Sequence, residues 1–244
     1  MPQIAYSEAE HEVWRVVCRE LAPKHERYAC RDFLAGVRAL GLPHDRIPQL
    51  DEVTARLEPL TGFRYLPAAG LVALKRFYSA LGDRTFFSTQ YIRHPSVPLY
   101  TPEPDLIHEV IGHGHLLATP TFSDLHRRAG VAANRLREED SLRFLSKVFW
   151  FSLEFGVVVE DEELRAYGAG ILSSYGEIDE FRGMEHRPLD LAEMGTADYD
   201  ITAYQPVLYR AEDVAEVVEV VGGFFDTCSD ESIARLRRSA SVHA

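Results

Sequence analysis

The chain has 244 residues, of which 46% are hydrophobic and 11% aromatic, and this is enough to bury a sizeable core in one large domain. Lys and Arg number 26 against 38 Asp and Glu, and the resulting net charge of -12 disfavours nucleic acid and anionic lipid surfaces as partners. We therefore expect a protein that binds small molecules, with no nucleic acid or membrane among its partners.

The cysteines and the N-terminus indicate the compartment. Cys18, Cys30 and Cys228 are odd in number and lack CxxC spacing, which disfavours a disulfide framework and a cysteine-based zinc site. The first residues lack the pattern of a secretion signal, and no stretch approaches the ~18 apolar residues of a membrane-spanning helix. We expect a cytoplasmic, soluble protein.

Three helices are predicted in the first quarter of the chain. Ser7 and Glu10 have capping-box spacing ahead of a helix over about 8–21. The second amphipathic stretch runs over 29–40 and stops at Gly41, and the third runs over 50–57 and stops at Pro59.

The middle of the chain alternates extended and helical patterns. Residues 63–70 and 86–92 are expected to be extended, with a helix over 71–81 between them. Asp105 is placed to cap a short helix that Gly112 ends.

The last third is again mainly helical. The pattern predicts helices over 122–136, 139–155 and 211–226, a small hairpin over 157–167, a strand at 206–211 and a polar tail that could be frayed. The fold class is therefore mainly α (α+β), a single domain of many helices with a few short strands.

His108, His113 and Glu154 form the clearest candidate site. Two imidazoles and one carboxylate are the ligand set that leaves positions open on Fe(II) for O₂ chemistry. Histidines five residues apart are rotated by ~140° on an α-helix, so both can bind one metal only if the helix breaks, and Gly112 is the expected break. A hydrogen-bonded histidine pair in the core is the simpler alternative. A hydrolytic zinc enzyme is disfavoured, because zinc proteases place their histidines four apart.

Four longer motifs extend this pattern, and with them the chain resembles the pterin-dependent aromatic amino acid hydroxylases, in particular the short bacterial phenylalanine-4-hydroxylase type. The resemblance covers about 62–223. The motifs are STQYIRH (88–94), PLYTPEPDLIHEVIGH (98–113), FWFSLEFG (149–156) and AYGAGILSSYGE (166–177).

The resemblance implies Fe(II) and a tetrahydropterin as cofactors, with His108, His113 and Glu154 as iron ligands. It also implies a substrate-carboxylate site and a slot for the aromatic ring. A guanidinium suits a carboxylate because it can bind both oxygens. The implied carboxylate-binding residues are Arg93, Thr101 and Ser173, and the implied ring-slot residues are Pro104, Trp150 and Phe155.

For the pterin, the resemblance implies stacking on Phe77, backbone contacts near Gly70 and Val72, and an interaction with Glu109, which counts among the catalytic residues. It divides the single domain into an N-terminal helical layer (1–61), an iron and pterin core (62–227) and a polar C-terminal tail (228–244).

Three positions depart from the family pattern. Phe87 replaces a common pterin-side histidine, Phe149 replaces a frequent tyrosine, and Gly114-His115 follows the second ligand where an apolar residue and proline are usual. We expect His115 to be a hydrogen-bonded or surface histidine rather than a ligand.

The leading functional hypothesis is 4-hydroxylation of phenylalanine by a monomer, with O₂ and tetrahydropterin as co-substrates. Tryptophan hydroxylation and phenylalanine 3-hydroxylation are alternatives within the family. A catalytically silent relative that binds aromatic amino acids is the alternative from another class.

Overall fold

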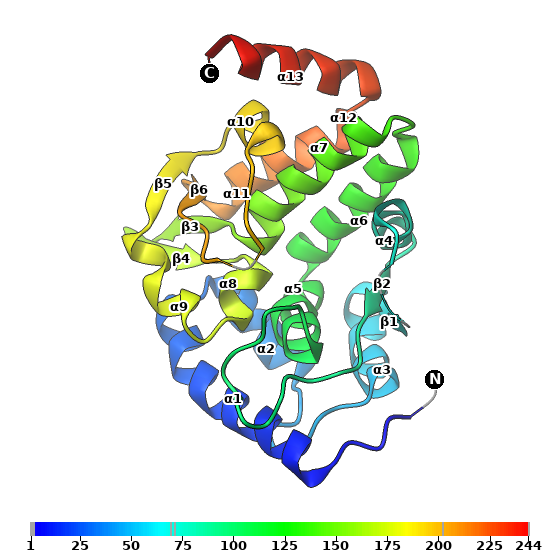
Figure 1. Ribbon diagram of the computed structural model, residues 1–244, viewed down its shortest axis with the longest axis vertical. Helices are drawn as coiled ribbons and strands as arrows, with labels where there is room; N and C mark the ends of the chain where they lie inside the picture. The colour runs from blue at the N-terminus through cyan, green and yellow to red at the C-terminus, as the bar shows by residue number, and fades with distance from the viewer. Residues whose placement is uncertain (1–2, 69, 71, 202, 244) are drawn as a thin grey trace.

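A computed structural model gives the architecture (Figure 1) and describes residues 3–68, 70, 72–201 and 203–243. Helices account for 59% of the chain and strands for 11%, which confirms the predicted mainly helical class. The α-helices are α1 (Glu8–Tyr28), α2 (Arg31–Leu40), α3 (Leu50–Thr61), α4 (Leu74–Gly82), α5 (Gly114–Leu117), α6 (Pro120–Arg135), α7 (Glu139–Phe149), α8 (Ala169–Ser173), α9 (Glu177–Glu180), α10 (Leu191–Thr196), α11 (Val214–Val217), α12 (Gly223–Thr227) and α13 (Asp230–His243).

Three π-helical segments and one 3₁₀ turn continue or connect these helices, and two small sheets complete the fold. The π segments are η1 (His108–His113), η2 (Trp150–Glu154) and η4 (Val218–Gly222), and the 3₁₀ turn is η3 (Phe181–Gly183). The strands are β1 (Arg64–Pro67), β2 (Thr85–Ser88), β3 (Val157–Glu160), β4 (Glu163–Ala166), β5 (Glu185–Pro188) and β6 (Val207–Ala211).

The larger sheet has the order β4-β3-β6-β5 and the smaller one pairs β1 with β2 in parallel. β3 and β4 form the predicted antiparallel hairpin, whose turn residues Asp161 and Glu162 have φ angles of 52° and 64°. β3 pairs with β6 and β6 with β5 in parallel. The sequence analysis did not predict β5.

α1 and α3 begin as predicted but end later, whereas α2 ends at Leu40 as predicted. Ser7 and Glu10 form the expected capping box of α1, yet the helix continues through Pro23 to Tyr28 instead of ending near residue 21. Its last turns are fixed by a long-range contact, because His25 is buried and bonds to the carbonyl of Leu172. α3 likewise passes through Pro59 and ends at Gly62, whose φ of 78° favours glycine.

The C-terminal residues form helix α13 rather than a frayed tail. The side chain of Ile233 is fully buried, and α13 packs against α10 and α7 at the top of Figure 1. An ion pair of 2.9 Å joins Arg237 of α13 to Asp140 of α7. A few apolar residues are sufficient to hold an otherwise polar segment when a partner surface is available.

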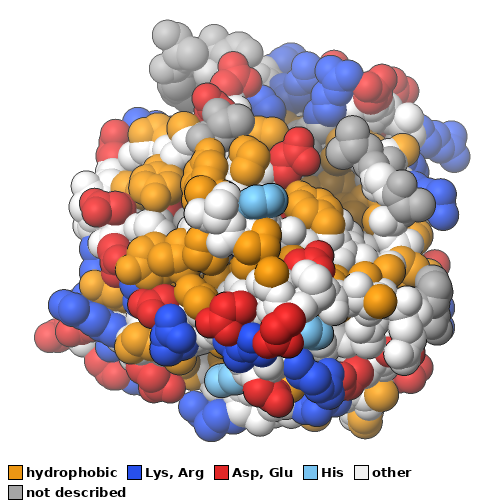
Figure 2. Space-filling view, turned by 60° about the horizontal axis from the view of Figure 1, so that its bottom comes forward, with side chains coloured by type: hydrophobic (Ala, Val, Ile, Leu, Met, Phe, Trp, Pro, Cys, Tyr) orange, Lys and Arg blue, Asp and Glu red, His pale blue; other side chains and the backbone are white. Residues whose placement is uncertain are grey.

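The centre of the molecule is the pair α6 and α7, with α4 packed on α6. The contact between α4 and α6 is very close, since a Cβ at Gly130 would lie 2.0 Å from the backbone nitrogen of Gly82. No helix in the described part of the chain has the length and apolar character to cross a membrane. The face in Figure 2 carries apolar side chains across its middle, with charged side chains of both signs around them.

Candidate metal centre and active site

Two π-helical segments supply the three candidate ligands. η1 carries His108 and His113, and η2 ends with Glu154. The helix does not break at Gly112, so that prediction was wrong. A π-helix bonds each residue to the fifth one before it, so residues five apart lie about one turn apart and face the same side. The imidazole centroids of the two histidines are accordingly only 4.8 Å apart.

Gly112 has a packing role instead of a helix-breaking one. A Cβ at this position would lie 2.7 Å from the carbonyl oxygen of Ala169 in α8. Because glycine has no Cβ, η1 can approach α8, the helix that carries Ser173. The same glycine that suggested a break keeps two parts of the site together.

The three side chains have the geometry of a metal-binding triad. Nε2 of His108 lies 3.5 Å from Oε2 of Glu154, and Nε2 of His113 lies 2.9 Å from Oε1. One ligand atom from each residue falls within 4.8 Å of the others. The Glu154 side chain is only 13% exposed, so these atoms face an enclosed space.

Hydrogen bonds fix which imidazole nitrogen of His108 is available. Its Nδ1 lies 2.9 Å from Oγ of Ser173, whose hydroxyl donates to the carbonyl of Ala169 at 2.8 Å. Because the hydroxyl hydrogen is already used, Ser173 accepts from Nδ1–H of His108. The lone pair of His108 is thus on Nε2, the nitrogen that faces Glu154.

The imidazole of His126 fixes which nitrogen of His113 is available to a metal. Nδ1 of His126 is 2.7 Å from the carbonyl of Phe122 and must carry the hydrogen, so its Nε2 is an acceptor. That Nε2 lies 3.3 Å from Nδ1 of His113. His113 therefore donates from Nδ1 and keeps its Nε2 lone pair for a metal. Both histidines are set in the tautomer that a metal requires.

Burial keeps the ligands in the matching protonation states. It lowers the pKa of His108 to about 4 and that of His113 to about 3, so both imidazoles are neutral at pH 7. Burial also raises the pKa of Glu154, and the neighbouring His108 opposes this shift. Two neutral imidazoles and one carboxylate fit a divalent metal such as Fe(II).

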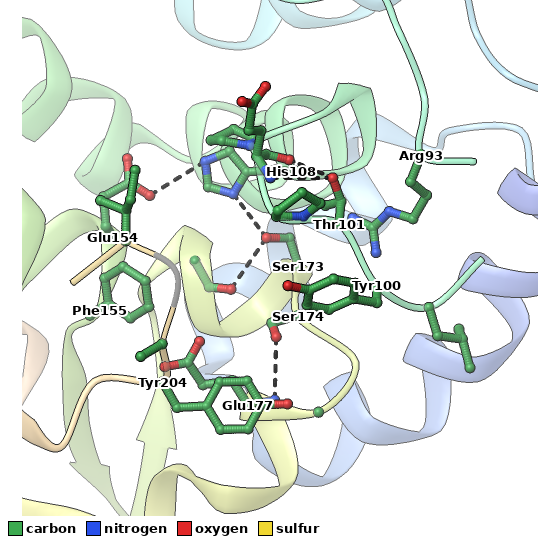
Figure 3. A pocket seen from close by; sticks show the side chains of 18 of the residues that line it. Arg93, Tyr100, Thr101, His108, Glu154, Phe155, Ser173, Ser174, Glu177 and Tyr204 are labelled. Carbon is green, nitrogen blue, oxygen red and sulfur yellow. Dashed lines mark hydrogen bonds and ion pairs between the residues drawn. The ribbon is translucent and has the colours of Figure 1, made fainter. Parts of the chain in front are cut away.

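A cavity of about 240 Å³ opens directly onto His108 and Glu154 (Figure 3). One wall is aromatic: Trp150 and Phe155 have ring centroids 4.6 Å apart, and Trp150 stacks on Tyr199 at 4.2 Å. Pro104 also lines the cavity. The structure thus brings together the three residues predicted for the ring slot.

Phe155 closes this wall against Gly170. A Cβ at residue 170 would lie 2.6 Å from Cζ of Phe155, so the ring occupies the space of the missing side chain. Phe155 therefore has little room to move without a change at residue 170.

Arg93 and Thr101 lie at the polar part of the cavity. Arg93 is 5% exposed and is bound through Nε and Nη2 to the two carboxylate oxygens of Asp105, each at 2.9 Å. No described residue bonds to Nη1, so the Nη1–Nη2 edge of the guanidinium is available to a ligand. The Thr101 hydroxyl donates to the carbonyl of Glu103 at 2.7 Å.

Two phenylalanine rings adjoin His113, and a buried carboxyl belongs to the same π segment. The rings of Phe77 and Phe86 meet edge to face at 5.6 Å, and Phe86 lies 4.8 Å from the His113 ring. Burial raises the pKa of Glu109 to about 8, and Glu154 adds to that shift.

Gly70 and Val72 precede α4. Gly70 is exposed with a φ of 144°, and Val72 is partly buried. Neither residue is in the substrate cavity, and the segment's positions 69 and 71 lie outside the described residues.

Sequence reasoning missed two residues of the site. Glu177 lines the cavity, accepts from the backbone of Gln205 at 2.9 Å, and has a pKa that burial raises to about 7. His126 holds His113. Glu177 closes one of the quoted motifs, which was an available signal, whereas no spacing distinguishes His126 from other helical histidines.

The three departures from the family pattern are placed as follows. Phe149 is buried against His126 and Tyr78, with ring centroids at 5.4 and 5.2 Å. The Phe87 ring lies under the Arg76 guanidinium at 5.1 Å. His115 is 6% exposed and is not part of the metal-binding cluster.

A family model and individual relatives of this chain indicate the same protein family. The model of the biopterin-dependent aromatic amino acid hydroxylases matches residues 1–235. The phenylalanine 3-hydroxylase of Streptomyces coeruleorubidus is 47% identical over all of this chain and 88% of its own length. The phenylalanine-4-hydroxylase of Dictyostelium discoideum is 40% identical over 93% of this chain, which spans about half of that protein (53%).

Solved structures agree. The phenylalanine hydroxylase of Colwellia psychrerythraea superimposes with a TM-score of 0.89 at 29% identity, covering 99% of this chain and 92% of that one. The Chromobacterium violaceum enzyme with bound iron(III) and 7,8-dihydrobiopterin gives 0.84 at 26% identity, covering 90% and 81%. This chain therefore belongs to the biopterin-dependent aromatic amino acid hydroxylases.

Proposed function

We propose that the chain is an iron- and tetrahydropterin-dependent monooxygenase that hydroxylates L-phenylalanine at C4 to give tyrosine. The observation that carries this proposal is the cavity that joins the His108, His113 and Glu154 cluster to an aromatic wall and a guanidinium edge. Iron, together with the pterin, supplies the activation of O₂ when bound. The protein's own residues hold the metal, orient the amino acid and keep water away.

The amino acid end of the substrate is recognised by charge. The free Nη1–Nη2 edge of Arg93 binds the carboxylate, while Asp105 holds the adjacent Nε–Nη2 edge and fixes the orientation of the guanidinium. Glu177 lies in the same cavity and is the acidic partner for the α-ammonium group. A cation next to Glu177 favours its ionised form, which burial alone disfavours.

The ring end is held by shape. Trp150 is fixed by its stack on Tyr199, and Phe155 by its contact with Gly170, so the slot between them and Pro104 is preformed. A ring held in this slot presents only certain carbons to the metal. Ser173 acts indirectly in this scheme, because its hydroxyl is engaged with His108 and Ala169.

The pterin occupies the side of the metal where Phe77 and Phe86 lie. Phe77 offers a face or edge for stacking, and Glu109 offers a hydrogen bond. At pH 7 the carboxyl of Glu109 is largely protonated in the metal-free protein, so it can donate as well as accept.

Hydroxylation at C3 is the second candidate. It is favoured by the 47% identity to the Streptomyces 3-hydroxylase over the full chain. The 4-hydroxylase of Dictyostelium is less similar, at 40%. The two reactions need the same ligands and the same carboxylate contacts, and they differ in how the ring lies between Trp150 and Phe155.

Product analysis decides between them. The iron-loaded protein is incubated with tetrahydropterin, air and an equimolar mixture of phenylalanine and tryptophan, and the products are separated by chromatography with mass detection. Para-tyrosine as the main pterin-dependent product supports the proposal. Meta-tyrosine favours the second candidate, hydroxytryptophan changes the substrate, and no product at all contradicts the enzyme assignment.

A further inference from the structure

A second cavity, of about 160 Å³, lies between α1, α2 and the segment that carries the two histidine ligands. No residue that lines it also lines the substrate cavity. Its walls are mainly apolar, with Trp14 and Leu21 from α1, Leu34 and Val37 from α2, and Ile111 from η1. The exposed residues Ala22, Glu26 and His44 lie at its margin.

His115 brings a polar group without a partner into this apolar cavity. The residue is 6% exposed, its ring stands edge-on to Phe33 at 5.2 Å, and its Nδ1 is buried without a hydrogen bond. The carbonyl of Ile111, one turn earlier, is the backbone group that interacts with the ring. No described residue bonds to Nε2 either. A buried imidazole nitrogen without a hydrogen bond is costly, and a ligand would remove that cost.

His25 adds a second acceptor. Its Nε2 lies 2.7 Å from the carbonyl of Leu172, so Nε2 carries the hydrogen and Nδ1 keeps a lone pair. No described residue bonds to this Nδ1. The cavity thus offers hydrogen-bond acceptors on imidazoles and apolar contacts everywhere else, and it lacks a buried cation that would hold an anion.

We propose that this cavity is a binding site for a small neutral phenol, a single aromatic ring with a hydroxyl group. The size fits, because an engineered apolar cavity of roughly 150 Å³ binds benzene. The ring would lie against Trp14, Leu34 and Val37, and the hydroxyl would donate to an imidazole nitrogen of His115 or His25. Glu26 at the margin disfavours ligands with a carboxylate.

The site is separate from the proposed reaction and does not depend on it. Ile111 and His115 belong to the same helical segment as His108 and His113 but line a different cavity. A ligand bound there would touch the segment that carries two metal ligands through residues that do not line the substrate cavity.

Calorimetric titration of the full iron-loaded protein tests the proposal. The protein is kept free of pterin and saturated with L-phenylalanine, and it is titrated with phenol and, in parallel, with toluene. We expect phenol to bind at one site and toluene, which has the same ring but no hydroxyl, to bind about tenfold more weakly. Equal affinities, or no binding of phenol, would overturn the proposal.

Two variants locate the site. Val37→Phe fills the cavity from α2 and should abolish phenol binding, while phenylalanine turnover and iron content stay unchanged. The control is Leu60→Phe, which adds a ring at an exposed position outside both cavities and should change none of these measurements. His115→Phe keeps the ring and removes the acceptor, and it should bring phenol to the affinity of toluene. Phenol binding that survives Val37→Phe would place the ligand elsewhere and refute this site.

Discussion

Two different regions adjoin the metal ligands. The first is a cavity with an aromatic wall, a fixed guanidinium and a buried carboxyl, and the second contains the rings of Phe77 and Phe86, next to His113, and the carboxyl of Glu109 in η1. The first side is fixed by ion pairs, ring stacks and a glycine contact. The second side consists mainly of aromatic rings that contact one another edge to face or tilted. Recognition by charge and shape is thus concentrated on the amino acid side, and recognition by stacking on the pterin side.

The largest effect is expected from removing the ligand that both sides share. Glu154→Ala should bind substoichiometric iron and give no turnover above background, because two imidazoles alone hold the metal poorly. Metal analysis and product detection measure this, with circular dichroism as the check on folding. Glu139→Ala, an exposed change in the preceding helix, is the control. Full activity of Glu154→Ala would refute the triad.

A smaller loss is expected from the imidazole behind His113. His126→Phe removes the acceptor for Nδ1 of His113 and should raise the dissociation constant for Fe(II) or Co(II) by about 10- to 100-fold. The measurement is metal titration of the apoprotein, independent of activity. An unchanged metal affinity would mean that His126 only packs against its neighbours.

The amino acid side can be tested at Glu177. Glu177→Gln removes the charge opposite the substrate ammonium and should raise KM for phenylalanine about tenfold with little change in kcat or in KM for pterin. Steady-state kinetics with each substrate varied separately measure this. A change confined to the pterin KM would reverse the assignment of the two sides.

The pterin side can be tested by restoring a polar group. Phe87→His should lower KM for tetrahydropterin by about two- to tenfold, the value of one hydrogen bond, and leave KM for phenylalanine unchanged. Phe87→Leu, which adds no polar atom, serves as the control. If both variants behave alike, packing rather than a hydrogen bond governs this position.

The smallest effect is the pH dependence of stability in the metal-free protein. The pKa of Glu109 is raised to about 8 and that of Glu177 to about 7, so the folded protein holds protons that the unfolded chain has lost. Stability should therefore fall as the pH rises from about 7.5 to 9, a full unit above the ordinary histidine pKa of about 6.5, where the histidines of the unfolded chain no longer bind protons. Denaturant titrations should show the slope, and Glu109→Gln and Glu177→Gln should each reduce it. A stability that rises over this range would contradict the shifts.

The sequence predicted the ligands better than their geometry. His108, His113 and Glu154 were identified by residue type and order, but α-helical geometry made a break necessary where the chain forms a π segment. Whether a stretch adopts π or α hydrogen bonding depends on tertiary packing, such as the contact of Gly112 with Ala169, and single residues do not reveal it.

The starts of α1, α3 and α7 were predicted from local patterns, whereas the short helices α8, α9 and α10 were not predicted. Helix ends were harder, because α1 and α3 continue through prolines that would stop an isolated helix, and α13 depends on a surface made by distant residues. The role of Arg93 in binding the substrate carboxylate stays a prediction, and its buried pairing with Asp105 is a contact across twelve residues that spacing alone does not indicate. His126 was missed for the same reason, whereas Glu177 stands in a quoted motif and was overlooked.

The π segments also determine how the centre tolerates changes in chain length. Each π turn contains one residue more than an α turn that spans the same rise, so it is equivalent to a single-residue insertion in an ordinary helix. Deleting one residue between His108 and His113 would let η1 relax to α geometry with the histidines four apart, the spacing typical of zinc hydrolases. Deletion of a single codon would therefore convert the oxygenase-type ligand spacing of this helix into a hydrolase-type spacing.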